Sequence, residues 1–166
     1  MIYIIGAMSK NRAIGKAGKL PWKVDEELEL FRRITYGNVV VMGRKTFQNV
    51  GELEGRRNIV LSSGGMKGTV EHYGSLESAL SGAETSGRRI FVIGGSETFS
   101  SALQFASFIY LSVIGVECEG DSFFPEIDES QWHLVGRRAF GRFEFLVYER
   151  NNYSHSIVEG GLSVIS

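Results

Sequence analysis

The side chain best placed for chemistry in this sequence is Glu27, a carboxylate that shares one helical face with apolar residues. The segment after Leu20-Pro21-Trp22 has helical spacing and is expected to begin a helix near Val24. The stripe that includes Glu27 consists of Val24, Leu28, Phe31, Ile34 and Thr35. A carboxylate among apolar neighbours is costly unless a partner binds it, and such surroundings raise its pKa. Glu27 therefore either binds a polar ligand group or only complements the dipole of a helix N-terminus.

Three strand-like segments each lead into a turn that contains glycine. Val39–Met42 precedes Gly43-Arg44-Lys45-Thr46, Asn58–Leu61 precedes Ser62-Ser63-Gly64-Gly65, and Ile90–Ile93 precedes Gly94-Gly95-Ser96-Glu97-Thr98. In an open α/β sheet, ligands bind outside the carboxyl ends of the strands, and glycine before a helix lets the backbone approach a phosphate. The Gly-x-Gly-x-x-Gly fingerprint and the Walker loop are absent. Cations and hydroxyls in these turns indicate a phosphorylated ribose, and hence NADP rather than NAD.

The elements that must position these groups alternate along the chain. Apolar strand-like runs at Ile2–Ala7 and in the three segments above are separated by helical patterns that begin near Val24, after Arg44, near 75–80 and at 96–105. This alternation predicts an α/β fold with a mostly parallel central sheet and helices on both faces. The strand-like segments 107–113, 132–138 and 143–149 follow. The short connection 139–142 predicts that the last two form an antiparallel hairpin at the sheet edge.

Composition restricts the class of protein. The 166 residues carry a net charge of −1, which argues against nucleic acid and membrane partners. The single cysteine, Cys118, cannot form an internal disulfide, and the three histidines lack metal-ligand spacing, so no metal is expected. No signal peptide or membrane-length apolar run is recognised, so we expect a cytoplasmic monomer. We expect one domain at 1–150 and a disordered or loosely docked tail at 151–166.

Several motifs, in matching order and spacing, resemble those of dihydrofolate reductase over about residues 1–150. They are Asn11-Arg12-Ala13-Ile14-Gly15, Leu20-Pro21-Trp22 before the acid Glu27, Met42-Gly43-Arg44-Lys45-Thr46, 55–62, Val92-Ile93-Gly94-Gly95 and 119–125. The resemblance implies reduction of 7,8-dihydrofolate to 5,6,7,8-tetrahydrofolate by hydride transfer from NADPH, in support of one-carbon metabolism. It also implies inhibition by antifolates such as trimethoprim and methotrexate.

The resemblance also implies roles for individual residues. Glu27 would bind the amino-pyrimidine edge of the pterin, Trp22 would order a water molecule, and Leu20 would belong to a mobile loop over the nicotinamide. The other implied substrate contacts are Ile5, Ala7, Leu28, Phe31, Val50, Leu53, Arg56, Ile93 and Ser112, with Arg56 on the glutamate carboxylate. The implied cofactor contacts are Ala7, Ile14, Gly15, Leu20, Gly43, Arg44, Lys45, Thr46, Leu61, Ser62, Ser63, Ile93, Gly94, Gly95, Ser96, Glu97, Thr98 and Phe99. Gly94-Gly95 matches a pair that the family joins by a cis peptide bond.

Some positions depart from the family pattern. Glu97 replaces a residue that is often basic, Phe99 replaces a common tyrosine, and Glu52 stands where some members carry a cation. Two alternatives stay open: a related NADPH-dependent pyrimidine reductase of riboflavin synthesis, and a catalytically silent nucleotide-binding module. An antifolate-resistant form is a further hypothesis, motivated by Leu20, Glu27 and the short hairpin loop.

Overall fold

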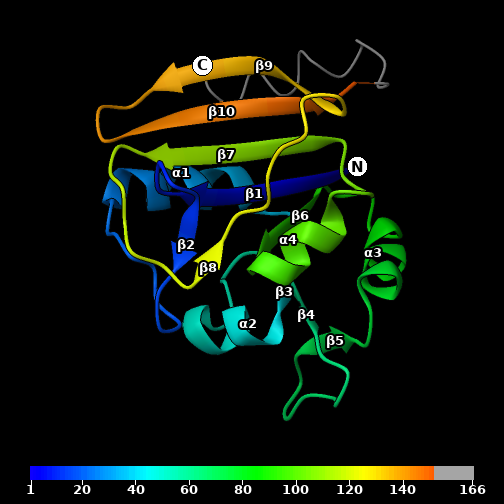
Figure 1. Ribbon diagram of the computed structural model, residues 1–166. Coiled ribbons are helices and arrows are strands. Elements are labelled where there is room, and N and C mark those ends of the chain that lie inside the picture. Colours follow the sequence, from blue (N-terminus) through cyan, green and yellow to red (C-terminus); the bar gives the residue numbers. More distant parts are fainter. Residues whose placement is uncertain (152–166) are drawn as a thin grey trace.

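The apolar runs of the sequence form the inner strands of one eight-stranded sheet (Figure 1). The computed structural model describes residues 1–151. The strand order is β5-β4-β3-β6-β1-β7-β10-β9, and β2 and β8 form a separate two-stranded sheet. The strands are β1 (Ile2–Met8), β2 (Ala13–Gly15), β3 (Val39–Gly43), β4 (Arg57–Leu61), β5 (Glu71–Tyr73), β6 (Ile90–Gly94), β7 (Phe108–Ile114), β8 (Ser122–Phe123), β9 (Trp132–Ala139) and β10 (Phe143–Arg150). The helices are α1 (Asp25–Thr35), α2 (Arg44–Val50), α3 (Leu76–Glu84) and α4 (Ser96–Ala102).

Strand direction divides the large sheet into two parts. From β5 to β7 every neighbouring pair is parallel, whereas β10 runs antiparallel to β7 and β9 runs antiparallel to β10. The hairpin of β9 and β10 is joined through residues 140–142 and forms one edge of the sheet. Both the mostly parallel sheet and the antiparallel C-terminal hairpin are therefore confirmed.

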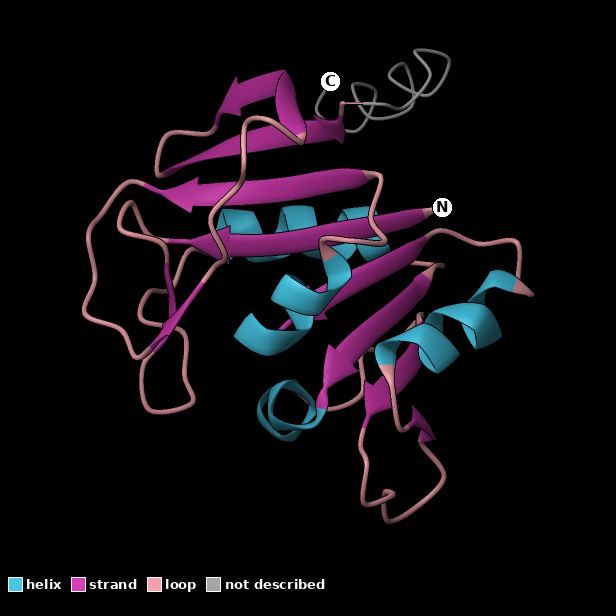
Figure 2. Ribbon diagram, turned by 45° about the vertical axis from the view of Figure 1, so that its right-hand side comes forward, coloured by secondary structure: helices cyan, strands magenta, loops and turns pink. Residues whose placement is uncertain are grey.

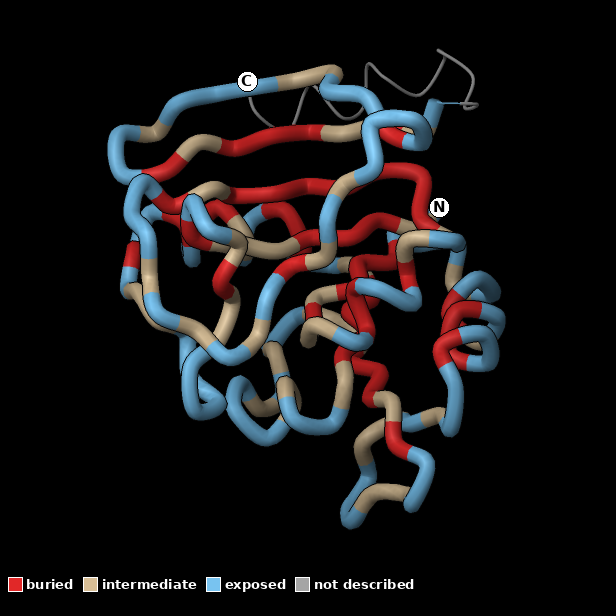
Figure 3. The backbone as a smooth tube through the Cα atoms, viewed as in Figure 1, coloured by how far each residue is buried: buried red, intermediate tan, exposed pale blue. Residues whose placement is uncertain are grey.

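The two faces of the sheet pack against different helices. Val39 and Val41 of β3 join the apolar cluster that contains residues of α3 and α4, whereas Val40 and Met42 join the cluster that contains residues of α1. Successive residues of a strand point to opposite faces, so a strand buried on both sides needs a continuous apolar run. Figure 2 shows α1 behind the sheet and the other helices in front or at the rim. Buried residues follow the central strands, and the loops are largely exposed (Figure 3).

The structure differs from the sequence expectations at short or polar elements. β5 was not predicted, because Glu71-His72-Tyr73 has no apolar pattern, and a bidentate ion pair from Arg57 to Glu71 holds it beside β4. The short strands β2 and β8 were not predicted either. The helix predicted at 96–105 ends at Ala102, and the one predicted near 75–80 extends to Glu84.

The buried stripe of α1 is also displaced from the predicted one. The helix begins after Val24, as expected, and buries Glu27, Leu30 and Ile34 against the sheet. Leu28, in contrast, is 41% exposed. Successive helical residues are separated by about 100° around the axis, so a stripe that includes Glu27 and Leu30 turns Leu28 toward the outside. None of the helices in the described part of the chain has both the length and the apolar composition to span a membrane.

Candidate active site

The carboxyl ends of the parallel strands meet along one edge of the sheet. Along this edge Ala7 of β1 pairs with Ser112 of β7, Met42 of β3 pairs with Gly94 of β6, and Gly43 is level with Leu61 of β4. Predicted site residues from distant parts of the sequence therefore lie on neighbouring strands. This edge is where ligands bind in open parallel sheets.

Glu27 is buried in the first turn of α1, and it is only 7% exposed. The hydroxyl of Ser112, which is 2% exposed, lies near the carboxylate as its hydrogen-bond donor group. Burial raises the pKa of Glu27, and the hydrogen bond from Ser112 opposes part of that rise. The expectation of a carboxyl group on a buried helical face is confirmed. Its position in the first turn also complements the helix dipole, so both sequence interpretations describe part of its environment.

Apolar side chains that the sequence assigned to the substrate lie on the face of the sheet that α1 covers. Phe31 and Leu53 are half-buried and pack at the border of the core on this face, while Ile5 of β1 is buried within it. Val50, at the end of α2, is 50% exposed, and Leu28 is also exposed. Leu28 directly follows Glu27 on α1, whereas Val50 ends a different helix, and single exposed apolar residues need no explanation.

Arg56 lies half-buried in the turn before β4. Its Nη1 donates a hydrogen bond of 3.1 Å to Thr35 Oγ1 at the end of α1, and its Nε donates to the backbone carbonyl of Glu54 at 3.0 Å. Burial lowers the pKa of Arg56, and the neighbouring Arg32 lowers it further, but a guanidinium stays protonated in proteins. Arg56 is thus a fixed cation suited to a carboxylate.

Glycine is required at the ends of β3 and β6, in one case because a side chain would be crowded and in the other because of the backbone conformation. A Cβ atom on Gly43 would lie 3.0 Å from Thr98 Oγ1, and Gly94 has a φ of +136° before a cis peptide bond to Gly95. A Cβ on Gly95 would lie 3.4 Å from Thr46 Oγ1. A side chain at Gly43 would crowd Thr98, so glycine lets the end of β3 and the start of α4 approach each other closely. The expected cis bond of Gly94-Gly95 is confirmed.

Charged and hydroxyl groups lie near these glycines, but not all of them are free. Arg44 and Lys45 are exposed, and neither forms an ion pair within residues 1–151. Ser62 is buried, and its hydroxyl donates to the carbonyl of Gly65 at 2.8 Å, so it closes its own turn. Ser63 is exposed. The structure therefore leaves Ser63, rather than Ser62, as the hydroxyl donor available to a phosphate.

The loop that carries Leu20 is joined to the segment before β8. Asp121 connects them twice: its N–H donates to the carbonyl of Gly15, and its Oδ2 accepts from the N–H of Ala17, both at 2.9 Å. Lys16 also pairs with Glu119. Leu20 is exposed, and Trp22 is half-buried against the apolar cluster beneath α1.

Asp121 lies in the motif at 119–125, but its sequence context predicted no function for it. Gly120 in the same motif has no room for a side chain, because a Cβ would lie 2.8 Å from the Cβ of Ala13. Close packing of this kind is visible only in three dimensions. Gly6 was missed for the same reason, since a Cβ there would lie 3.0 Å from the ring of Phe99.

Phe99 and the remaining predicted cofactor residues are distributed around the same edge. Phe99 is buried and packs against Phe124, with ring centroids 4.9 Å apart. Ile93 and Ile14 are half-buried, while Ser96 and Glu97 open α4, with Glu97 exposed. The structure brings these residues to the strand ends, and their contacts with a cofactor stay a prediction.

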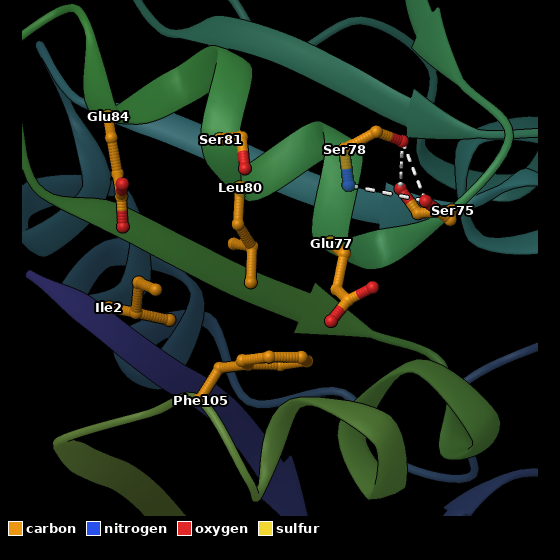
Figure 4. A pocket seen from close by; sticks show the side chains of 8 residues that line it. All are labelled: Ile2, Ser75, Glu77, Ser78, Leu80, Ser81, Glu84 and Phe105. Atoms are coloured by element: carbon orange, nitrogen blue, oxygen red, sulfur yellow. Dashed lines mark hydrogen bonds between the residues drawn. The ribbon is translucent and has the colours of Figure 1, made fainter.

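An open hollow at the opposite end of the sheet does not match the predicted site. It is lined by Ile2, Ser75, Glu77, Ser78, Leu80, Ser81, Glu84 and Phe105, as Figure 4 shows. Ile2 begins β1, so this hollow lies beside the amino end of that strand. Its charged lining residues are glutamates, which repel phosphate. We therefore place the active site at the carboxyl edge.

The carboxyl edge thus combines a buried acid with a glycine-lined backbone surface and free cations. That combination is typical of reductases that use a nicotinamide dinucleotide. Known proteins point to the same class. The family model described as "Dihydrofolate reductase" matches residues 1–158.

Individual relatives agree with the family match. The chain is 39% identical to dihydrofolate reductase of Bacillus subtilis, across 93% of this chain and 97% of that protein. It is 33% identical to dihydrofolate reductase HdrB of Haloferax volcanii, across 89% and 82%. A structure of dihydrofolate reductase from Enterococcus faecalis, complexed with NADP(H) and RAB-propyl, matches with a TM-score of 0.84 and 32% identity, across 92% of this chain and 97% of that one. The chain belongs to the dihydrofolate reductase family.

Proposed function

We propose that this protein reduces 7,8-dihydrofolate to 5,6,7,8-tetrahydrofolate with NADPH, and that Glu27 is its catalytic acid. The observation that carries the proposal is the buried carboxyl group of Glu27, hydrogen-bonded to Ser112 at the carboxyl edge of the sheet. This side chain faces no cation among the described residues that would balance its charge. A ring edge with two N–H donors would supply the missing partner.

Glu27 has two tasks in this proposal. Its carboxylate binds the amino-pyrimidine edge of the pterin and sets the orientation of the ring. Because burial raises its pKa, the side chain also holds a proton at higher pH than an exposed glutamate would. In this way Glu27 favours protonation of pterin N5 through a water molecule, which Trp22 helps to order. Ser112 keeps the carboxyl group in place by its hydrogen bond.

The remaining proposed contacts bind the glutamate tail and the pterin ring of the substrate. Leu28, Phe31, Val50 and Leu53 cover the apolar parts of the ligand and exclude water from the ring. Arg56 binds the carboxylate of the glutamate tail, because its guanidinium is fixed and charged. Antifolates that carry the same ring edge compete for this site.

The backbone at these strand ends fits NADPH, because Gly43 precedes α2 and Gly95 precedes α4, and a glycine before a helix lets the backbone approach a phosphate. We propose that Gly43, Gly94 and Gly95 accept the cofactor against the backbone, while Arg44, Lys45 and Ser63 bind the phosphate on its adenosine ribose, which NADH lacks. Bound NADPH supplies the hydride that reaches C6 of the pterin. The loop of Leu20, held by Asp121, excludes water from this reaction.

The test is to measure the turnover rate of the purified full chain, which is monitored as the decrease in NADPH absorbance. We expect reduction of dihydrofolate with NADPH and a much higher KM with NADH. The pyrimidine substrate of riboflavin synthesis serves as the control. Turnover of that pyrimidine instead of dihydrofolate would replace the proposal with the related reductase, and NADPH binding without turnover of either substrate would favour a silent nucleotide-binding module.

We further propose a monomer in the cytoplasm, with the catalytic domain at residues 1–150. A single cysteine suits a reducing compartment. The predicted tail lies beyond the described residues, apart from Asn151, which bonds to Gln131 and His133. Sedimentation equilibrium tests the monomer: a mass of twice the chain at micromolar concentration would overturn it.

A further inference from the structure

Arg56 is attached to the end of α1 by a buried threonine. Thr35 is fully buried, and its hydroxyl donates to the carbonyl of Phe31 at 2.9 Å. That hydrogen bond directs the proton of the hydroxyl away, so the oxygen is free to accept from Arg56 Nη1 at 3.1 Å. The helix thereby sets the orientation of an arginine that lies 21 residues further along the chain.

The guanidinium is fixed at a second point within its own turn. Arg56 Nε donates to the carbonyl of Glu54, so the two anchors use two of its five N–H groups and leave three for a ligand. Arginine has a large rotamer entropy, and a free side chain would lose it on binding. Two anchors remove that cost before the ligand arrives.

The turn itself is held by Asn58 of β4, which is only 6% exposed. Asn58 Oδ1 accepts from the N–H of Leu53 at 2.8 Å, and Nδ2 donates to the carbonyls of Leu53 and Arg56, both at 2.9 Å. All three bonds end on the backbone of this one turn. Gly55, with a φ of +78°, allows the turn to pass beneath Tyr36, because a Cβ there would lie 2.1 Å from its ring.

We propose that Thr35 and Asn58 are positioning residues that orient Arg56 to bind the carboxylate of the substrate tail. The proposal rests on the function given above, in which Arg56 binds that carboxylate. Thr35 orients the guanidinium, and Asn58 orients the backbone that carries it. Neither residue touches the reacting atoms, so both act on the affinity for a carboxylate-bearing ligand and not on the chemical step.

The direct test is Thr35→Val, which keeps the shape of the side chain and removes the acceptor. We expect KM for dihydrofolate to rise about tenfold, since a hydrogen bond to a charged group is lost. We expect kcat and KM for NADPH to stay within about twofold, since only uniform substrate binding is affected. Thr35→Ser restores the hydroxyl and should restore KM. Failure of Thr35→Ser to restore it would contradict the role of the hydroxyl.

Two inhibitors separate positioning from general damage to the fold. Methotrexate carries a glutamate, whereas trimethoprim has a similar ring edge and no carboxylate. Thr35→Val should weaken methotrexate binding about tenfold and leave trimethoprim binding nearly unchanged. Equal weakening of both inhibitors would overturn the proposal. The wild-type turnover assay is independent of this comparison of inhibitors. If the protein reduces dihydrofolate but Thr35→Val weakens both inhibitors equally, the proposed function stands and the positioning role of Thr35 is refuted.

A double-mutant cycle with Arg56→Ala checks that Thr35 acts through Arg56. In the Arg56→Ala background, Thr35→Val should cause no further loss of methotrexate affinity, because the group that it orients is gone. Additive losses would show that Thr35 acts by another route. Asn58→Asp, which replaces two donated hydrogen bonds with repulsion, should reproduce the selective loss for methotrexate. If that variant does not fold, the Thr35 cycle still decides the proposal.

Discussion

The two sides of the proposed site are built by different physical means. The substrate side consists of Glu27, Ser112, Thr35 and Arg56, and the nucleotide side consists of Gly43, Arg44, Lys45, Gly94 and Gly95. On the substrate side, polar groups are buried or half-buried and joined by hydrogen bonds, and burial shifts the pKa of Glu27 and of Arg56. On the nucleotide side, the backbone is bare and the cations are exposed.

The substrate side therefore depends on precise tertiary contacts to a greater extent than the nucleotide side. Buried polar groups interact strongly because water does not screen them, so small changes should have large effects there. Exposed cations are screened by salt, and either of two neighbours can compensate for the other. Single isosteric substitutions should therefore change substrate binding, while cofactor binding should depend on the charge of the side chains and on ionic strength.

The largest effect is expected from Glu27→Gln, which keeps the shape and removes the acid. Loss of a general acid that also orients the ring should lower kcat/KM for dihydrofolate by about 100-fold to 1,000-fold at pH 7. Steady-state kinetics measure this, with KM for NADPH as the control on the other side. Near-normal turnover in this variant would remove Glu27 from the mechanism.

On the nucleotide side, the double substitution of Arg44→Ala with Lys45→Ala should raise KM for NADPH about tenfold or more, because charge-assisted contacts to phosphate are lost. KM for dihydrofolate and KM for NADH should change little. The effect should shrink at high salt, since both side chains are exposed in the structure. A loss that does not depend on ionic strength would indicate that these cations are not exposed in the complex.

A smaller effect is expected from Ser112→Ala, which removes the hydrogen bond to the Glu27 carboxylate. That bond opposes the rise in pKa caused by burial, so its loss raises the pKa of Glu27 further. The alkaline limb of kcat/KM for dihydrofolate should move to higher pH, and the maximum should fall about threefold to tenfold. Ser112→Thr keeps the hydroxyl and should retain the wild-type profile. A limb that moves to lower pH would contradict the assigned contact.

The smallest effect concerns stability and pH. Because burial raises the pKa of Glu27 above its ordinary value of 4.5, the folded state binds this proton more tightly than the unfolded state. The resulting stabilisation is complete below pH 4.5 and is lost as pH rises through the folded-state pKa. Glu27→Gln should therefore gain stability relative to wild type as pH rises from 4.5 to 7. Urea unfolding at both pH values measures this, and the opposite trend would contradict burial of the charge.

Much of the fold could be predicted from local sequence patterns, because burial of an element dictates the spacing of its apolar residues. The apolar runs of β3, β4 and β6 are buried on both faces, so periodicity alone identified them. β5 and β2 were missed because three-residue strands have too few residues for a pattern. Leu28 was assigned to the wrong face because it stands four residues after Val24, whereas the buried stripe in the structure runs through Glu27, Leu30 and Ile34.

Local sequence patterns specify the alternation of strands and helices, the glycine-led turns and the conflict between Glu27 and its apolar neighbours. These features are local, since each depends on residues within one or two turns of the chain. The contacts between distant groups, in contrast, arise from the folded core: Thr35 with Arg56, Ser112 with Glu27, and Asp121 with Ala17. Asp121 and Ala17 are 104 residues apart in sequence, and no local propensity encodes such a contact. It follows from sheet order and register, which arise when the whole core is buried at once.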